Sequence, residues 1–170
     1  MSHNRIQEYL ANGKKFDIVM VNAFLASEAG YYLAKKLDAS IVIYSTGQVA
    51  IPWVDAALGQ PHNPSYMPNP LLESSMEMSF LERLISFVTN AMLQYGFRDF
   101  YVLGKVDKLL DKHFPGETRQ SLIELERNAT LALAFSHPLI QDGWHPVNPN
   151  YVHLGMMNCR YDFKFTSKSM

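Results

Sequence analysis

Polar residues that could bind a ligand follow two apolar runs of the sequence. Asn22 directly follows the first run, 16–21. Ser45, Thr46 and Gly47 follow the second run, 41–44. In open α/β sheets, ligands and catalytic groups gather at the carboxyl ends of the strands. These four residues are therefore either site residues or ordinary turn and capping residues at strand ends.

A second group of residues could line an apolar pocket near the same strand ends. It consists of Phe24, Trp53, Tyr66 and Met67. Pockets for small molecules are mostly apolar and aromatic. Because 48% of the chain is hydrophobic, the same side chains could also be plain core.

Several common kinds of site are disfavoured. The histidines and Cys159 do not have the short spacings of metal ligands. The chain also lacks a glycine-rich phosphate loop and a Gly-x-Ser-x-Gly nucleophile elbow. The formal net charge of −1 comes from dispersed charges of both signs, so nucleic acid is not an expected partner.

The hydrophobic pattern predicts a strand over 16–21, a helix over 26–37 and a strand over 41–44. Continuous β-branched runs are typical of buried parallel strands, so the first strand should be buried on both faces. Two such strands around one helix form a parallel βαβ unit. The later strands are expected at 131–135 and 151–154.

The remaining segments are a loop and two helices. Five prolines in 47–72 predict an ordered loop without a long helix. The longest helix is expected over 79–113, with breaks at Gly96 and Gly104. Arg83 on this helix would form an ion pair or bind a carbonyl group. A short helix over 118–128 would be capped by Thr118.

Length and composition indicate one α/β domain. A chain of 170 residues is long enough for one core and too short for two sizeable ones. The single cysteine, Cys159, forms no internal disulfide and leaves the redox compartment open. The sequence shows neither a signal peptide nor an apolar run that could span a membrane.

Several blocks together resemble one known family. They are Phe16-Asp-Ile-Val-Met-Val-Asn-Ala-Phe24, Ile41-Val-Ile-Tyr-Ser-Thr-Gly47, Pro64-Ser-Tyr-Met-Pro68, Met78-Ser-Phe-Leu-Glu-Arg83, Leu131-Ala-Leu-Ala-Phe-Ser-His-Pro138 and Pro149-Asn-Tyr-Val-His-Leu-Gly-Met-Met-Asn-Cys159. This pattern is similar to the N-terminal, acceptor-binding domain of animal UDP-glycosyltransferases, with arthropod members nearest in character. The resemblance covers about residues 4 to 160.

The resemblance implies an incomplete Rossmann-like parallel sheet, part of the N-terminal domain of a GT-B glycosyltransferase. Such enzymes transfer a hexosyl group from a UDP-sugar to a small lipophilic hydroxyl acceptor, with inversion. UDP-sugar is a co-substrate, and neither a metal nor another cofactor is implied. A histidine removes the proton of the acceptor, and an aspartate orients and charges that histidine.

Carried over to this chain, Asn22 occupies the position of that aspartate. An amide can orient an imidazole but cannot stabilise its charge. The catalytic histidine would lie upstream of Met1, and the nucleotide-sugar domain is not expected in these residues. Ser45, Thr46 and Gly47 would approach the donor sugar. Residues 1–160 are thus interpreted as part of the acceptor domain, and 161–170 as a divergent tail.

Two functions stay open at this point. The sequence could belong to an enzyme at the lumenal face of the endoplasmic reticulum membrane, although the 170 residues alone would be inactive. Alternatively, it could be a truncated, non-catalytic domain that binds an apolar ligand or a full-length family member. A partial gene model would also explain the expected absences.

Overall fold

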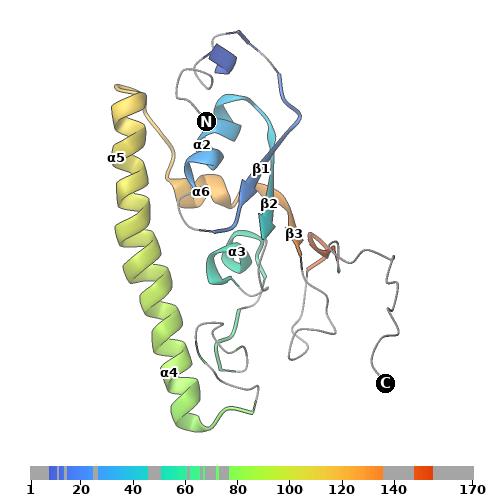
Figure 1. Ribbon diagram of the computed structural model, residues 1–170, viewed down its shortest axis with the longest axis vertical. Coiled ribbons are helices and arrows are strands. Elements are labelled where there is room, and N and C mark those ends of the chain that lie inside the picture. The colour runs from blue at the N-terminus through green and yellow to red at the C-terminus, as the bar shows by residue number, and fades with distance from the viewer. Residues whose placement is uncertain are drawn as a thin grey trace, which may run out of the picture.

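The protein is an α/β fold built on a four-stranded parallel sheet (Figure 1). The computed structural model describes residues 8–10, 12–13, 15–24, 27–45, 51–60, 62–65, 67, 72, 77–135 and 148–154. The strands lie in chain order, and each neighbouring pair is parallel: β1 (Ile18–Asn22), β2 (Ser40–Ser45), β3 (Ala129–Ala134) and β4 (Tyr151–His153). The predicted parallel sheet is confirmed, with strand ends shifted by one or two residues.

Helix α2 (Ala29–Lys36) connects β1 to β2, which confirms the predicted βαβ unit. The helix approaches β1 closely at Gly30. A Cβ atom added there would lie 3.0 Å from Cγ2 of Val21. The absence of a side chain at Gly30 therefore allows α2 to pack directly on the strand.

A short helix, α3 (Pro52–Ala57), lies within the segment that its prolines predicted to be a loop. Pro52 occupies the first turn of α3, where the missing N–H would have had no partner within the helix. Gly59 follows the helix with φ +65°, a conformation that glycine adopts without strain. The chain therefore turns back immediately after α3.

One long helix runs along the side of the molecule (Figure 1). It consists of α4 (Phe80–Ala91), the π-helical segment η1 (Met92–Val102) and α5 (Leu103–His113). The predicted helix is confirmed, but the predicted breaks at Gly96 and Gly104 are wrong. A glycine costs a helix only about 1 kcal/mol relative to alanine, and here the helix widens through η1 instead of ending.

Side-chain caps begin two of the helices. Ser79 and Glu82 form a capping box, in which Ser79 N–H donates to Glu82 Oε2 at 2.6 Å. This hydrogen bond lowers the pKa of the Glu82 carboxyl.

Two further predictions concern side chains at helix starts. Arg83 Nε donates to the carbonyl of Met78 at 2.9 Å, one of its two predicted roles. The last helix, α6 (Leu122–Glu126), is capped by Ser121, so the prediction of Thr118 is wrong.

The described core lies on one face of the sheet. It joins inward residues of the strands, such as Val21, Ile43 and Ala132, to residues of α2, α3, α5 and α6. On the other face of β1, Ile18 is 56% exposed and Met20 is 55% exposed. The expected burial of this strand on both faces is therefore wrong for the part of the chain that the structure describes.

A buried charge cluster attaches the long helix to this core. We define the charge cluster as Glu28, Arg98 and Glu126, which are all buried, together with the hydroxyl of Tyr31. Arg98 Nη2 donates to Glu126 Oε2 at 2.6 Å, and Tyr31 donates to the other oxygen of Glu126 at 3.1 Å. Arg98 Nε lies 3.9 Å from Glu28 Oε1. One guanidinium thus faces two buried carboxylates from two other elements.

Burial governs the protonation of this cluster. It raises the pKa of Glu126, although the Arg98 guanidinium opposes that shift. Burial and the neighbouring Glu126 raise the pKa of the Tyr31 hydroxyl, which stays protonated. Since the folded-state pKa of Glu126 is raised, its contribution favours folding most at low pH and weakens as the pH rises.

We expect Arg98→Met to lower the free energy of unfolding by about 3–5 kcal/mol near pH 7, because two buried carboxylates would lose their cation. The loss should shrink at about pH 4, where the carboxyls take up protons. Chemical denaturation at both pH values measures the effect. Arg127→Met, at an exposed position, is the matched control. Equal losses in the two variants would contradict a structural role for the cluster.

Candidate functional site

Asn22 lies at the carboxyl end of β1, as predicted, beside Tyr44 of β2. Its side chain is partly buried, and Oδ1 accepts a hydrogen bond from Phe24 N–H at 2.9 Å. This is a local turn interaction. The turn role that the sequence left open is therefore present, and the histidine-orienting role stays a prediction.

The other predicted residues that the structure describes differ in burial. Ser45 is buried at the end of β2, and its Oγ has no hydrogen-bond partner among the described residues. Phe24 is 60% exposed, whereas Met67 is buried and fits the core alternative. Thr46, Gly47 and Tyr66 lie outside the described residues.

Trp53 connects α3 to the residue that follows the carboxyl end of β1. Its indole Nε1 donates to the carbonyl of Ala23 at 2.9 Å. The guanidinium carbon of Arg98 lies 5.5 Å from the centre of the Trp53 ring, within the range of a cation–π contact. Trp53 therefore links the charge cluster to the residue that follows Asn22.

A histidine–carboxylate pair lies beyond this edge, and the sequence interpretation missed it. Asp55 on α3 has only 1% of its surface exposed, and its Oδ2 lies 2.7 Å from Nδ1 of His62. The turn at Gly59 brings His62 back beside α3, and Gln60 N–H donates to the carbonyl of Asp55 at 2.7 Å. The only signal in the sequence is a carboxylate and a histidine seven residues apart around a glycine.

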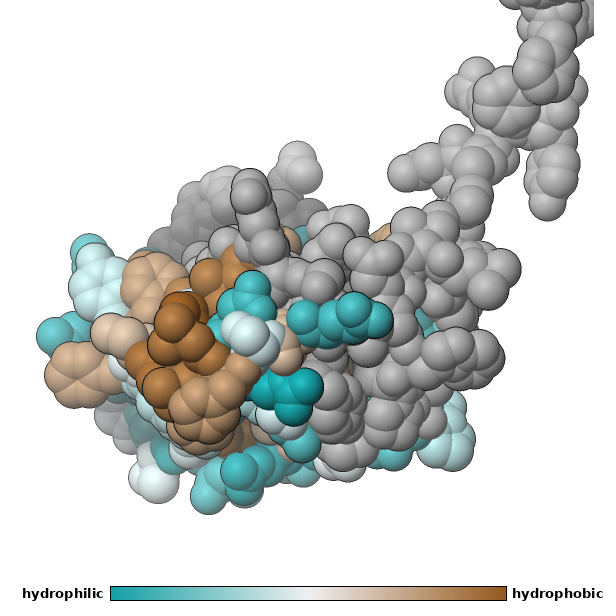
Figure 2. Space-filling model, turned by 90° about the horizontal axis from the view of Figure 1, so that it is seen from below, coloured by the Kyte–Doolittle hydropathy of each residue, from teal (hydrophilic) through white to brown (hydrophobic). Residues whose placement is uncertain are grey.

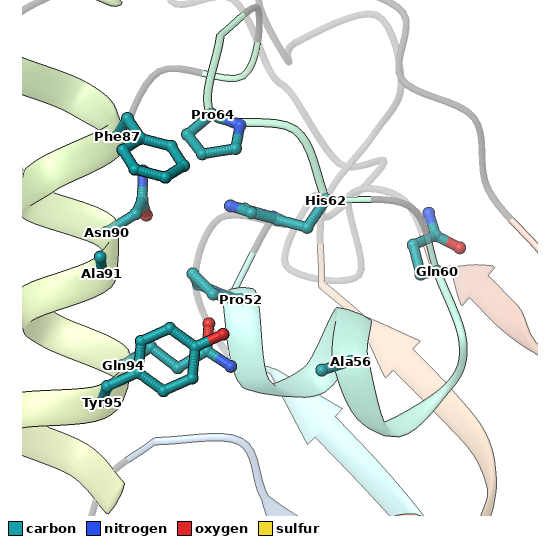
Figure 3. Close-up of a pocket in the computed structure, with 10 residues that line it drawn as sticks. All are labelled: Pro52, Ala56, Gln60, His62, Pro64, Phe87, Asn90, Ala91, Gln94 and Tyr95. Carbon is teal, nitrogen blue, oxygen red and sulfur yellow. The ribbon is translucent and has the colours of Figure 1, made fainter. Parts of the chain in front are cut away.

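His62 of this pair lines a cavity of about 340 Å³ between α3 and the long helix, and Asp55 contacts His62 from α3. Figure 3 shows the imidazole of His62 reaching toward the long helix between Pro52 and Pro64. The cavity is lined by Pro52, Ala56, Gln60, His62, Pro64, Phe87, Asn90, Ala91, Gln94 and Tyr95. Figure 1 shows α3 beyond the carboxyl end of β2. The cavity, which residues of α3 help to line, therefore lies at the end of the sheet where ligands usually bind.

Polar groups around the cavity are held by further contacts. Asn90 Nδ2 donates to the carbonyl of Ser86 at 2.9 Å, and Gln60 Oε1 accepts from Asn148 N–H at 2.7 Å. Burial and the negative charge of Asp55 raise the pKa of the Tyr151 hydroxyl, which remains neutral. In contrast, Nε2 of His62 is buried and has no hydrogen-bond partner in the described structure.

A second cavity, of about 440 Å³, lies near Ser40 and Thr130, which are at the amino-terminal ends of β2 and β3. This edge of a parallel sheet is not where ligands usually bind. Among the described residues, no three histidine, cysteine or acidic side chains gather as metal ligands would. The helices in the described ranges are also too short or too polar to cross a membrane.

The chain matches a protein-family model described as UDP-glucoronosyl and UDP-glucosyl transferase over residues 2–168. It is 27% identical over 146 residues to UDP-glycosyltransferase UGT5 of Dactylopius coccus, which covers 85% of this chain and 26% of that protein. It is 26% identical over 149 residues to UDP-glucuronosyltransferase 3A1 of Xenopus laevis, with 86% and 26% covered.

These curated relatives are much longer proteins, and the chain spans about a quarter of their length. No solved structure matches the chain significantly. The family match nevertheless covers nearly all of the sequence, and the observed parallel sheet with flanking helices agrees with it. The chain therefore belongs to the UDP-glucoronosyl and UDP-glucosyl transferase family.

Proposed function

We propose that this chain forms part of the acceptor-binding domain of a UDP-glycosyltransferase with GT-B architecture. The enzyme would transfer a hexosyl group from a UDP-sugar to a small lipophilic hydroxyl compound with inversion. One structural observation supports the acceptor side in particular. The cavity on the carboxyl side of the sheet combines aromatic and proline walls with uncharged amide and imidazole groups, as pockets for small molecules with a hydroxyl group do.

The proposal gives Asn22 a limited chemical role. Its position at the end of β1 corresponds to the family aspartate, but its amide carries no charge and already accepts from Phe24 N–H. It can help to position a histidine, whereas the imidazolium formed by proton transfer would gain no carboxylate partner from it. The proposed reaction needs no metal, and a second domain would hold the UDP-sugar through helix termini.

The place of action proposed for the complete protein is the lumenal face of the endoplasmic reticulum membrane. Conjugation of small lipophilic compounds there would serve detoxification. The family resemblance supports both this location and this role.

A second candidate function is association with a full-length member of the family. The observation that favours it is a row of exposed apolar side chains on α4, formed by Phe80, Leu81, Leu84, Ile85 and Val88. Figure 2 shows a hydrophobic patch at the end of the molecule where α4 begins. Contiguous apolar surface of this kind marks a contact site with another protein.

We expect residues 1–170 expressed alone to show no measurable hydrolysis or transfer of UDP-sugar, because the proposed catalytic histidine and most of the proposed donor site would lie outside these residues. Product formation is measured by mass spectrometry with a mixture of phenolic acceptors. Protein-dependent product above the level of a heat-denatured sample would contradict this prediction.

A chimera tests the positive side of the proposal. The part of this chain that aligns with the Dactylopius UDP-glycosyltransferase UGT5, over 146 residues, replaces the corresponding segment of that protein. Transfer to a phenolic acceptor is expected, with the anomeric configuration inverted in the product. Asn22→Asp should raise turnover about tenfold or more, since positioned acid–base groups contribute roughly 10² to 10⁴. Asn128→Asp, at the opposite edge of the sheet, is the matched control. No gain from Asn22→Asp would exclude the assigned relay position.

The association candidate predicts concentration-dependent self-association or binding to a full-length relative. Leu81→Lys combined with Ile85→Lys should weaken it, because charges on the α4 row oppose apolar contact. Leu109→Lys, at an exposed position of α5, is the control. Sedimentation velocity measures the effect, and a monodisperse monomer at all concentrations, with no binding to the relative, would exclude this candidate.

A further inference from the structure

The Asp55–His62 contact leaves one imidazole nitrogen of His62 without a hydrogen-bond partner in the described structure. An ionised carboxylate can only accept hydrogen bonds, so in the neutral imidazole Nδ1 carries the proton and donates to Asp55 Oδ2. The other nitrogen, Nε2, is then a hydrogen-bond acceptor. It is buried and unpaired among the described residues. A buried acceptor without a partner is unfavourable, and a ligand that donates a hydrogen bond removes that penalty.

The walls of the cavity indicate the rest of the ligand. Phe87 and Tyr95 from the long helix and Pro52 and Pro64 from the opposite side provide flat apolar surfaces (Figure 3). A cavity of about 340 Å³ is at the lower end of the range for small-molecule sites. Its size and surface therefore suit a compact aromatic molecule.

The lack of charged residues in the cavity lining indicates which of the two substrates of the proposed reaction the cavity suits. None of its lining residues is lysine, arginine, aspartate or glutamate. A diphosphate is normally bound by cationic side chains or by backbone N–H groups at a helix N-terminus. The cavity lining offers no such cation, which disfavours the UDP-sugar as its ligand.

We propose that the cavity between α3 and the long helix binds a small aromatic alcohol or phenol, whose hydroxyl donates to Nε2 of His62. Asp55 acts as a positioning residue that fixes the tautomer of His62. The assignment of this molecule as the sugar acceptor rests on the function proposed above, whereas its binding does not.

Binding of 1-naphthol and of 1-methoxynaphthalene to residues 1–170 tests the inference, since the ether has a similar shape but no hydrogen to donate. Calorimetry should show that the unmodified protein prefers 1-naphthol by roughly fivefold to tenfold, the value of one hydrogen bond. His62→Phe should abolish this preference while leaving the affinity for the ether similar. Equal affinities of the unmodified protein for both probes would overturn the inference.

Two variants on the long helix test the apolar wall. Phe87→Ala should weaken binding of both probes, because Phe87 lines the cavity. Phe100→Ala makes the same change at a residue of the same helix that is 84% exposed, and it should alter neither affinity. An effect of Phe100→Ala as large as that of Phe87→Ala would overturn the placement of the ligand.

A spectroscopic measurement covers the case in which His62→Phe does not fold. In the unmodified protein labelled with ¹⁵N-histidine, 1-naphthol should shift the resonance of one neutral imidazole that is protonated on Nδ1, and 1-methoxynaphthalene should not. No imidazole shift with 1-naphthol would overturn the inference.

Selective binding without sugar transfer by the chimera would support the site and count against the proposed function. Sugar transfer by the chimera without selective binding of 1-naphthol would support the proposed function and count against the site.

Discussion

The contact of Arg98 with Glu126 and Glu28 determines where the long helix lies. Arg98 is in η1, whereas Glu28 precedes α2 and Glu126 ends α6. The same helix supplies Phe87 and Tyr95 to one wall of the cavity. Because removal of a buried charge from its partners is costly, this cluster favours one position of the helix over others. The shape of the cavity thus depends on an interaction outside it.

Trp53 connects that constraint to the carboxyl edge of the sheet. One side of its ring is near Arg98, and its indole nitrogen donates to the carbonyl of Ala23. Trp53 belongs to α3, the same helix that carries Asp55. The long helix, α3 and the end of β1 are therefore joined through one aromatic side chain. Trp53, which was predicted to line a pocket, thus holds together the elements that form one.

The parts of the fold that could be predicted from sequence are those encoded locally. The run 41–44 predicts its strand because β-branched side chains suit a buried parallel strand. Positions that depend on distant contacts were predicted poorly. Gly96 does not end its helix, because flanking segments and the charge cluster hold the helix together. The exposure of Ile18 and Met20 depends on which elements cover a face of the sheet, and hydropathy does not encode that choice.

The candidate site also has one part that the sequence predicts and one part that it does not. The location of Asn22 follows from strand order, whereas the Asp55–His62 contact requires a turn at Gly59 that brings a loop residue back onto a buried helix position. A carboxylate beside an imidazole usually suggests a base. Here, however, Nε2 is buried in the wall of a cavity whose lining has no lysine, arginine, aspartate or glutamate. These surroundings suit recognition of a neutral hydroxyl better than proton transfer during attack on UDP-sugar.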